Sequence, residues 1–288
     1  MSMQMNAMKS RYLETVSSQY LALESSLVHY VRMGSGHPLV LVHGGGMWLY
    51  SFRHNIPNLS RHFSVFALDM PGYGYSVPFG RGRLSGLEET SRTLLGFIDR
   101  LGLGRVSLLG HSWGGGWVLH FASHHPDRVD RLILIDSSGF DVPDVLEWEL
   151  LKLPFIGPLL LKCVTPGGVR KRIERSFYDR ERVTAEMARE VYIPLKLEHN
   201  RKAQARIARG LHWRETERAI PRITQPCLVI WGENDRYLDV GLCARFQQEL
   251  ADVRSHIFRE CGHSPHEELP DEVNGLIIRF LTGSGSRG

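Results

Sequence analysis

Short strand-like runs recur along the chain, and they constrain its fold more than any other feature. Several are almost continuously apolar, as expected of strands buried on both faces of a parallel sheet. Residues 87–101 and 273–281 instead space their apolar side chains as helices do, and residues 20–24 and 27–32 read as a hairpin. This alternation predicts an α/β fold with a mostly parallel, doubly wound sheet. The runs are residues 39–42, 64–68, 106–109, 132–135, 228–231 and 254–258.

One long segment, residues 140–222, interrupts the alternation. It favours helices, contains several prolines and holds no convincing strand. A structureless loop of that length is improbable inside a compact domain. We therefore expect a helical cap inserted into a discontinuous core made of residues 20–139 and 223–282. Residues 1–19 are expected to form a separate N-terminal segment, and the Gly/Ser-rich residues 283–288 a flexible tail.

Composition excludes several classes of protein. With 42% hydrophobic and 23% charged residues among 288, the chain is neither wholly disordered nor collagen-like. No apolar run approaches the ~18 residues of a membrane-spanning helix, and residues 1–12 lack the apolar core of a signal peptide. The four cysteines have neither metal-finger nor CxxC spacing. We expect a cytoplasmic protein without a transmembrane segment, which could form a homo-oligomer.

The positive charge is concentrated in the segment expected to form the cap. The net charge is +4, yet residues 162–218 alone contain fifteen Lys or Arg and eight Asp or Glu. Basic and acidic residues alternate there, which favours a solvated helix face over nucleic-acid binding. Attraction of an anionic substrate or a lipid surface by residues 170–182 remains open.

The segment Gly110-His111-Ser112-Trp113-Gly114 carries the chemistry. An apolar strand precedes it, and a helical pattern rich in glycine follows it. A serine flanked by glycines between a strand and a helix predicts a nucleophile elbow, which exposes the hydroxyl at the carboxyl edge of the sheet. The alternative is a tight strand–helix turn that contains a serine by chance.

A nucleophilic serine needs a base, and the base needs a carboxylate that orients it. Asp235 follows the run 228–231 and His263 follows the run 254–258. Both therefore belong at the sheet edge where open α/β sheets bind ligands. The order Ser112, Asp235, His263 is the order expected of this elbow type. Three alternatives stay open, namely Glu233 or Asp136 as the acid and His266 as the base.

A tetrahedral oxyanion requires two backbone N–H donors. One is expected from Trp113, the residue after the nucleophile. The other is expected from Gly45 in the segment His43-Gly44-Gly45-Gly46, with Gly46 as the alternative. His43 is expected to brace this loop by hydrogen bonding.

Taken together, these motifs resemble the α/β-hydrolase superfamily, and specifically its cap-bearing members. The resemblance covers residues 20–281 and includes Asp69-Met70-Pro71-Gly72-Tyr73-Gly74-Tyr75-Ser76, which matches the D-x-P-G-x-G-x-S turn of the family. Ser112 differs from the aspartate nucleophile of epoxide hydrolases and haloalkane dehalogenases. The carbon–carbon hydrolases of aromatic-ring breakdown are similar in length and cap, but many have Trp after the catalytic His where this chain has Ser264.

The expected function is a serine hydrolase that cleaves a carboxylic ester or related acyl bond through an acyl-enzyme. The alternatives are hydrolysis of a carbon–carbon bond in a vinylogous 1,5-diketone, a thioesterase, and, in another class, a ligand receptor or a non-hydrolytic natural-product enzyme. The motifs require neither metal nor organic cofactor. A small apolar acyl or aromatic substrate is expected, with binding residues His43, His111, Trp148, Leu153 and Phe155.

Overall fold

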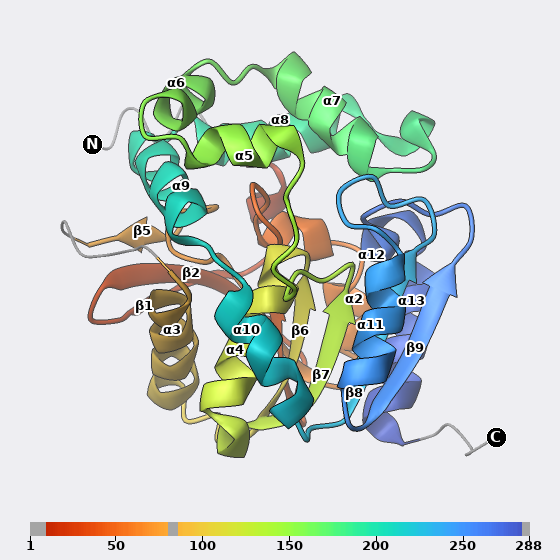
Figure 1. Ribbon diagram of the computed structural model, residues 1–288. Coiled ribbons are helices and arrows are strands. Elements are labelled where there is room, and N and C mark those ends of the chain that lie inside the picture. The colour runs from red at the N-terminus through yellow and green to blue at the C-terminus, as the bar shows by residue number, and fades with distance from the viewer. Residues whose placement is uncertain (1–9, 80–85, 284–288) are drawn as a thin grey trace.

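A single sheet forms the centre of the computed structural model, which describes residues 10–79 and 86–283 (Figure 1). Its order is β1-β2-β4-β3-β6-β7-β8-β9, and β5 pairs with β2. The strands from β4 to β9 on this path are parallel, whereas β1 and β2 form an antiparallel hairpin. The predicted mostly parallel α/β sheet is confirmed. The strands are Ser18–Ala22 (β1), Ser26–Met33 (β2), Pro38–Val42 (β3), Ser64–Leu68 (β4), Val77–Pro78 (β5), Val106–His111 (β6), Val129–Ile135 (β7), Cys227–Gly232 (β8) and Val253–Phe258 (β9).

Helices cover both faces of the sheet, so alternate residues of one strand enter different cores. In β3, Val40 and Val42 pack with side chains from α3, α4 and α11, whereas Leu39 and Leu41 pack with side chains from α2 and α13. Burial on both faces explains why the central strands read as continuous apolar runs. The helices outside the cap segment are Ile56–Leu59 (α2), Leu87–Arg100 (α3), Trp113–His124 (α4), Gly241–Glu249 (α11), Pro265–Glu268 (α12) and Pro270–Thr282 (α13).

The described part of the chain between Phe140 and Arg222 contains helices and no strand. Figure 1 shows α5 to α9 above the carboxyl ends of the parallel strands, whereas α10 lies beside α4 on a face of the sheet, so the segment that covers the sheet edge ends earlier than expected. Thr165 and Thr184 cap two of its helices by accepting hydrogen bonds from the N–H groups of Gly168 and Met187. We call residues 140–222 the cap. Its helices are Leu146–Lys152 (α5), Ile156–Lys162 (α6), Pro166–Ser176 (α7), Ala185–Leu195 (α8), Glu198–Gly210 (α9) and Arg214–Ala219 (α10).

Several short elements differ from expectation. Strand β5 has only two residues, too few for a recognisable pattern, and β1 begins at Ser18, inside the expected N-terminal segment. Of that segment, residues 1–9 lie outside the described residues, as does all of the expected tail except Gly283. The 3-10 helices are Tyr12–Glu14, Leu49–Phe52, Pro126–Arg128, Arg180–Arg182 and Ile220–Arg222. None of the helices in the described ranges has the length and apolarity needed to cross a bilayer.

The turn at Asp69 ties the hairpin to the parallel strands. The Asp69 carboxylate accepts hydrogen bonds from the Leu49 and Tyr75 N–H groups and lies 2.7 Å from His29 Nδ1. A Cβ atom at Gly74 would lie 1.9 Å from Asp69 Oδ2, so only glycine fits there. This turn therefore fixes the edge of the sheet beside the loop that follows β3.

Candidate active site

The elbow between β6 and α4 holds Ser112 in a backbone conformation that few non-glycine residues adopt, with φ 52° and ψ −122°. Tight packing at the flanking glycines makes this turn possible. A Cβ atom at Gly110 would lie 2.4 Å from the Gly114 carbonyl oxygen, and one at Gly114 would lie 2.3 Å from the Val42 carbonyl oxygen. Both glycines of the motif are thus required by sterics, and Ser112 lines a pocket above the sheet.

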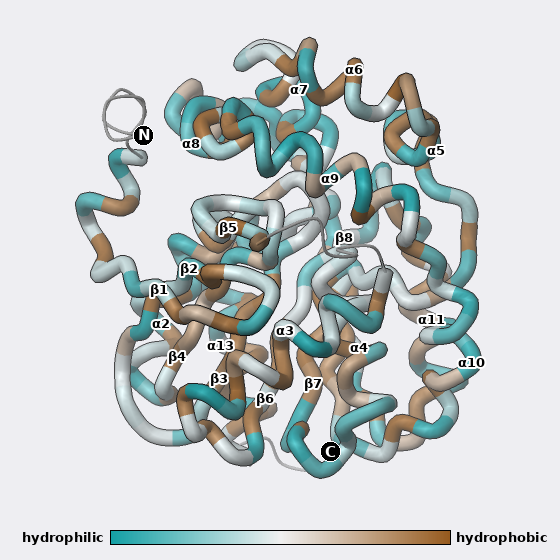
Figure 2. Tube along the Cα trace, turned by 90° about the vertical axis from the view of Figure 1, so that its left-hand side faces the viewer, coloured by the Kyte–Doolittle hydropathy of each residue, from teal (hydrophilic) through white to brown (hydrophobic). Residues whose placement is uncertain are grey.

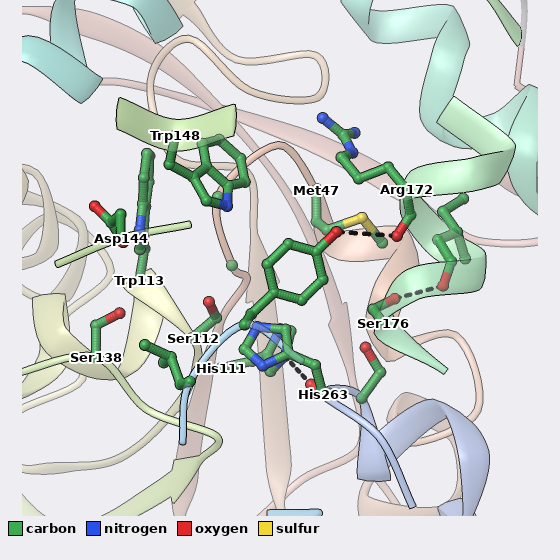
Figure 3. A pocket seen from close by; sticks show the side chains of 16 residues that line it. Met47, His111, Ser112, Trp113, Ser138, Asp144, Trp148, Arg172, Ser176 and His263 are labelled. Carbon is green, nitrogen blue, oxygen red and sulfur yellow. Dashed lines mark hydrogen bonds between the residues drawn. The ribbon is translucent and has the colours of Figure 1, made fainter. Parts of the chain in front are cut away.

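Asp235 and His263 meet at the same sheet edge. His263 Nδ1 lies 2.7 Å from Asp235 Oδ2, and the other carboxylate oxygen accepts hydrogen bonds from the N–H groups of Tyr237 and Leu238. A carboxylate only accepts, so Nδ1 carries the proton and Nε2 keeps a free lone pair. His263 lines the same pocket as Ser112, and Figure 3 shows both side chains at its floor. The arrangement can deprotonate a serine hydroxyl.

The structure places the three alternative residues differently. Glu233 is exposed, and its N–H donates to the Phe258 carbonyl. His266 is buried beside the ring of His111 and outside the pocket lining, and burial lowers its pKa to about 3. Asp136 is fully buried next to Asp235, and its Oδ1 accepts a hydrogen bond from the Gly232 N–H. Burial and the Asp235 charge raise the pKa of Asp136 well above its ordinary value.

The glycine loop after β3 lies against the elbow. A Cβ atom at Gly45 would come within 2.6 Å of the Trp113 ring, and one at Gly44 within 3.0 Å of the Ser112 Cβ atom. In the described residues, neither the Gly45 nor the Trp113 N–H has a backbone acceptor outside regular helix and strand bonding. These two amides are therefore available to an oxyanion. The Gly46 carbonyl accepts a hydrogen bond from the cap.

His43 braces this loop and does not line the pocket. Its Nδ1 donates to the Gly44 carbonyl at 2.9 Å, and its Nε2 accepts from the Met70 N–H at 3.0 Å. Burial lowers the pKa of His43, so the ring is neutral in this pair of bonds. The expected bracing role fits these contacts, whereas His43, which was also expected to bind substrate, is not among the residues that line the pocket.

The pocket comprises about 580 Å³ of empty space, part of which is open to solvent. Of the expected binding residues, His111 and Trp148 line it. Leu153 and Phe155 do not, because they lie on the outer side of the cap with 42% and 89% of their surface exposed. Figure 3 shows Trp113 and Trp148 on one side of the pocket, and Met47 and Arg172 on the other.

Arg172 is a pocket residue that the sequence did not single out. Its Nη2 donates to the Gly46 carbonyl at 3.0 Å, and within the described residues no carboxylate lies at ion-pair distance from it. Burial lowers the pKa of the guanidinium, which nevertheless stays a cation at neutral pH. The pocket thus contains a positive charge that forms no ion pair with a described carboxylate and feels Glu147 only from a longer distance.

Comparisons with known proteins agree with this geometry. The alpha/beta hydrolase family matches residues 39–276. The chain belongs to this family. It is 30% identical, over 90% of its own length and 92% of the relative, to the 2-hydroxy-6-oxo-6-phenylhexa-2,4-dienoate hydrolase of Comamonas testosteroni.

Two further relatives are named for different substrates. This hydrolase is 32% identical, over 86% of its length and 90% of the relative, to the 2-hydroxy-6-oxo-2,4-heptadienoate hydrolase of Pseudomonas putida. Its fold matches the crystal structure of a bacterial membrane phospholipase A with a TM-score of 0.75, at 27% identity, covering 95% of this chain and 88% of the other. Of these three relatives, two are thus named as hydrolases of dienoates and one as a phospholipase.

The hydrolase also joins its cap directly to the loop that carries His263. The His263 N–H donates to the Ser176 carbonyl at the end of α7, at 2.7 Å. Glu268 accepts from the N–H groups of Gly262, Tyr178 and Asp179 at 2.7, 2.8 and 3.3 Å. Sequence analysis missed Glu268, because one glutamate in a short helix carries no local signal. Its carboxylate connects the cap backbone with the backbone of the histidine loop.

Proposed function

We propose that this hydrolase cleaves a carbon–carbon bond in a carboxylate-bearing vinylogous diketone, with Ser112 as nucleophile, His263 as base and Asp235 as the acid that orients it. The observation that carries the proposal is the Arg172 cation in the Ser112 pocket, which has no carboxylate at ion-pair distance among the described residues. Two relatives are named for dienoate substrates, which carry a carboxylate. A guanidinium binds a carboxylate with two parallel hydrogen bonds. This reading replaces the ester as the leading hypothesis.

The proposed chemistry uses the groups at the pocket floor. Ser112 Oγ adds to the keto carbonyl while His263 Nε2 takes its proton, and the N–H groups of Gly45 and Trp113 hold the oxyanion. Collapse of the tetrahedral intermediate breaks the carbon–carbon bond. The electron pair moves into the vinylogous system, which takes a proton from His263. Water activated by His263 then hydrolyses the acyl-enzyme and releases a carboxylic acid.

The decisive experiment compares two substrates in four proteins. The substrates are 2-hydroxy-6-oxo-6-phenylhexa-2,4-dienoate, followed by loss of its absorbance, and a neutral p-nitrophenyl ester. The proteins are the wild type, Ser112→Ala, Arg172→Met and the matched control Arg170→Met, an exposed arginine on the same helix that pairs with Glu174. Loss of a charged hydrogen bond predicts a fall of about 10- to 100-fold in kcat/KM for the dienoate in Arg172→Met.

The ester and Arg170→Met serve as the internal controls. Arg172→Met should change ester turnover by less than about threefold, and Arg170→Met should change neither reaction. Ser112→Ala should abolish both reactions and labelling by a fluorophosphonate probe. A wild type that hydrolyses the ester but leaves the dienoate intact would refute carbon–carbon cleavage. Absence of probe labelling in the wild type would instead favour a receptor.

Ester hydrolysis is the second candidate. Ser264 stands directly after His263, where many carbon–carbon hydrolases have a tryptophan. The phospholipase relative acts on an ester by its name. Apolar side chains, among them Met47, Ile173 and Leu238, also line the pocket and suit an acyl chain. Preference for p-nitrophenyl esters of longer chain over the dienoate would support this candidate.

A further inference from the structure

The outer side of the cap carries a cluster of exposed apolar side chains that the catalytic proposal does not use. Phe155 is 89% exposed, Leu146 73% and Leu159 60%. All members of the cluster lie on α5, on α6 or in the turn between them, and Figure 2 shows hydrophobic residues of both helices at the outer edge of the molecule. We call this cluster the cap-tip patch: Leu146, Leu153, Phe155, Ile156, Leu159 and Leu160.

Packing within the protein does not explain the patch. Helix α6 turns Gly157 and Leu161 inward, where both are buried, and this face packs with α5 and α9. Its remaining apolar residues point outward. A helix that is apolar on all sides is normally buried on all sides, and soluble monomers rarely expose a large contiguous apolar patch. The outward half of α6 therefore has the composition of a surface that contacts something other than water.

The charges around the patch indicate what it contacts. Residues 153–172 include four Lys or Arg and no Asp or Glu. Lys162 and Lys171 are exposed, and neither forms an ion pair within the described part of the chain. On α5, by contrast, Glu147 and Glu149 are already paired with basic side chains. An apolar tip beside exposed lysines that form no ion pair in the described residues is complementary to an anionic lipid surface.

We propose that the cap-tip patch inserts into the interfacial layer of a membrane containing anionic phospholipid, with Lys162 and Lys171 at the headgroups. A second copy of the chain is the less suitable occupant, because a symmetric contact would bring the lysines of both copies together. In Figure 1, α6 lies at the outer edge of the cap, away from the sheet. The proposal does not depend on which bond the enzyme cleaves.

The test measures binding of the full chain to vesicles of phosphatidylcholine with or without phosphatidylglycerol, by flotation. Binding should require phosphatidylglycerol and weaken with salt. The double variant Phe155→Ser/Leu159→Ser should bind the vesicles at least about tenfold more weakly than the wild type. The double variant Lys162→Gln/Lys171→Gln should also bind them at least about tenfold more weakly. The matched controls, Ile257→Ser and Arg254→Gln/Arg259→Gln, remove exposed residues at β9 and should bind as the wild type does. Thermal unfolding confirms that every variant is folded.

Three outcomes would overturn the proposal. The first is no binding of the wild type to phosphatidylglycerol vesicles at low salt. The second is equal loss of binding in the patch variants and their controls. The third is a dimer in sedimentation velocity that Phe155→Ser/Leu159→Ser dissociates, in a protein that does not bind vesicles, because the occupant is then a second copy. Vesicle binding is read without substrate, so it is independent of the proposed carbon–carbon cleavage.

Discussion

Replacing Asp136 by asparagine should stabilise the protein, increasingly so as the pH rises. Asp136 is buried beside Asp235, and its pKa is well above 3.8 in the folded protein. The folded state therefore keeps a proton that the unfolded state releases above about pH 3.8. Between these two pKa values the wild type should lose about 1.4 kcal/mol of unfolding free energy per pH unit through this group. Asparagine cannot titrate, so the variant lacks this loss.

The structure accommodates the amide. In Asp136→Asn, the amide oxygen can accept the Gly232 N–H bond that Asp136 Oδ1 accepts at 3.0 Å, and the amide nitrogen would face Asp235 as a donor. Asparagine also tolerates the positive φ of 41° at this position. Urea unfolding at several pH values between 4 and the folded pKa measures the difference in unfolding free energy between variant and wild type. The matched control is Asp252→Asn, at an exposed position.

The difference in unfolding free energy between Asp136→Asn and the wild type should grow by about 1.4 kcal/mol per pH unit and then level off. A difference that is flat, or that shrinks with pH, would refute the argument that Asp136 is protonated in the folded state. Activity separates the two acids. Asp136→Asn should retain turnover within a few-fold, whereas Asp235→Asn should lose about 10⁴-fold. Equal losses would mean that Asp235 is not the acid that orients His263.

Three further predictions concern the packing around two glycines, the Glu268 carboxylate and the burial of the cysteines. Gly114→Ala places a Cβ atom 2.3 Å from the Val42 carbonyl oxygen, and urea unfolding should show that the free energy of unfolding falls by about 2–3 kcal/mol. The control Gly167→Ala has open space around the new Cβ atom, and its free energy of unfolding should rise by about 0.5–1 kcal/mol. Glu268→Gln turns an amide donor toward N–H groups, so the free energy of unfolding should fall by about 2–3 kcal/mol and kcat should fall as well. An unchanged free energy of unfolding would mean that the carboxylate does not hold the cap to the loop that carries His263. In a thiol titration, Cys163 alone should react rapidly, because the other three cysteines are buried with raised pKa values; four equally fast thiols would contradict that burial.

The sequence predicted those parts of the site that local geometry determines. Ser112 follows from a strand, two glycines and a helix, all within residues 106–124. Asp235 and His263 follow from their positions after strands, because parallel strands end at one edge. The central strands were recognisable for the same reason that they are stable, which is burial on both faces.

The cap was less predictable, because orientation decides which of its side chains reach the pocket. Phe155 and Leu153 were expected inside because they are apolar, yet α6 is apolar on every side and only its contacts with α5 and α9 determine which side is buried. Arg172 is one of six basic residues between positions 170 and 182. A helical-face argument could have found it, since it shares a face of α7 with the buried Val169 and Ile173.

The hydrogen bond from the His263 N–H to the Ser176 carbonyl has a consequence for engineering the enzyme. Helix α7 carries Arg172 near its middle and ends at Ser176, so one helix positions both the guanidinium that we propose binds the substrate and the carbonyl that accepts the hydrogen bond from His263. Helices α5 and α6 have no such bond to His263 in the described structure. Helix α5 contributes Trp148 to the pocket, whereas no residue of α6 is among those that line it. Chimeras that exchange α6 alone with that of a relative should therefore keep their turnover rate, whereas chimeras that exchange α7 alone should lose it. The cap is thus exchangeable at α6 and coupled to the candidate catalytic residues at α7.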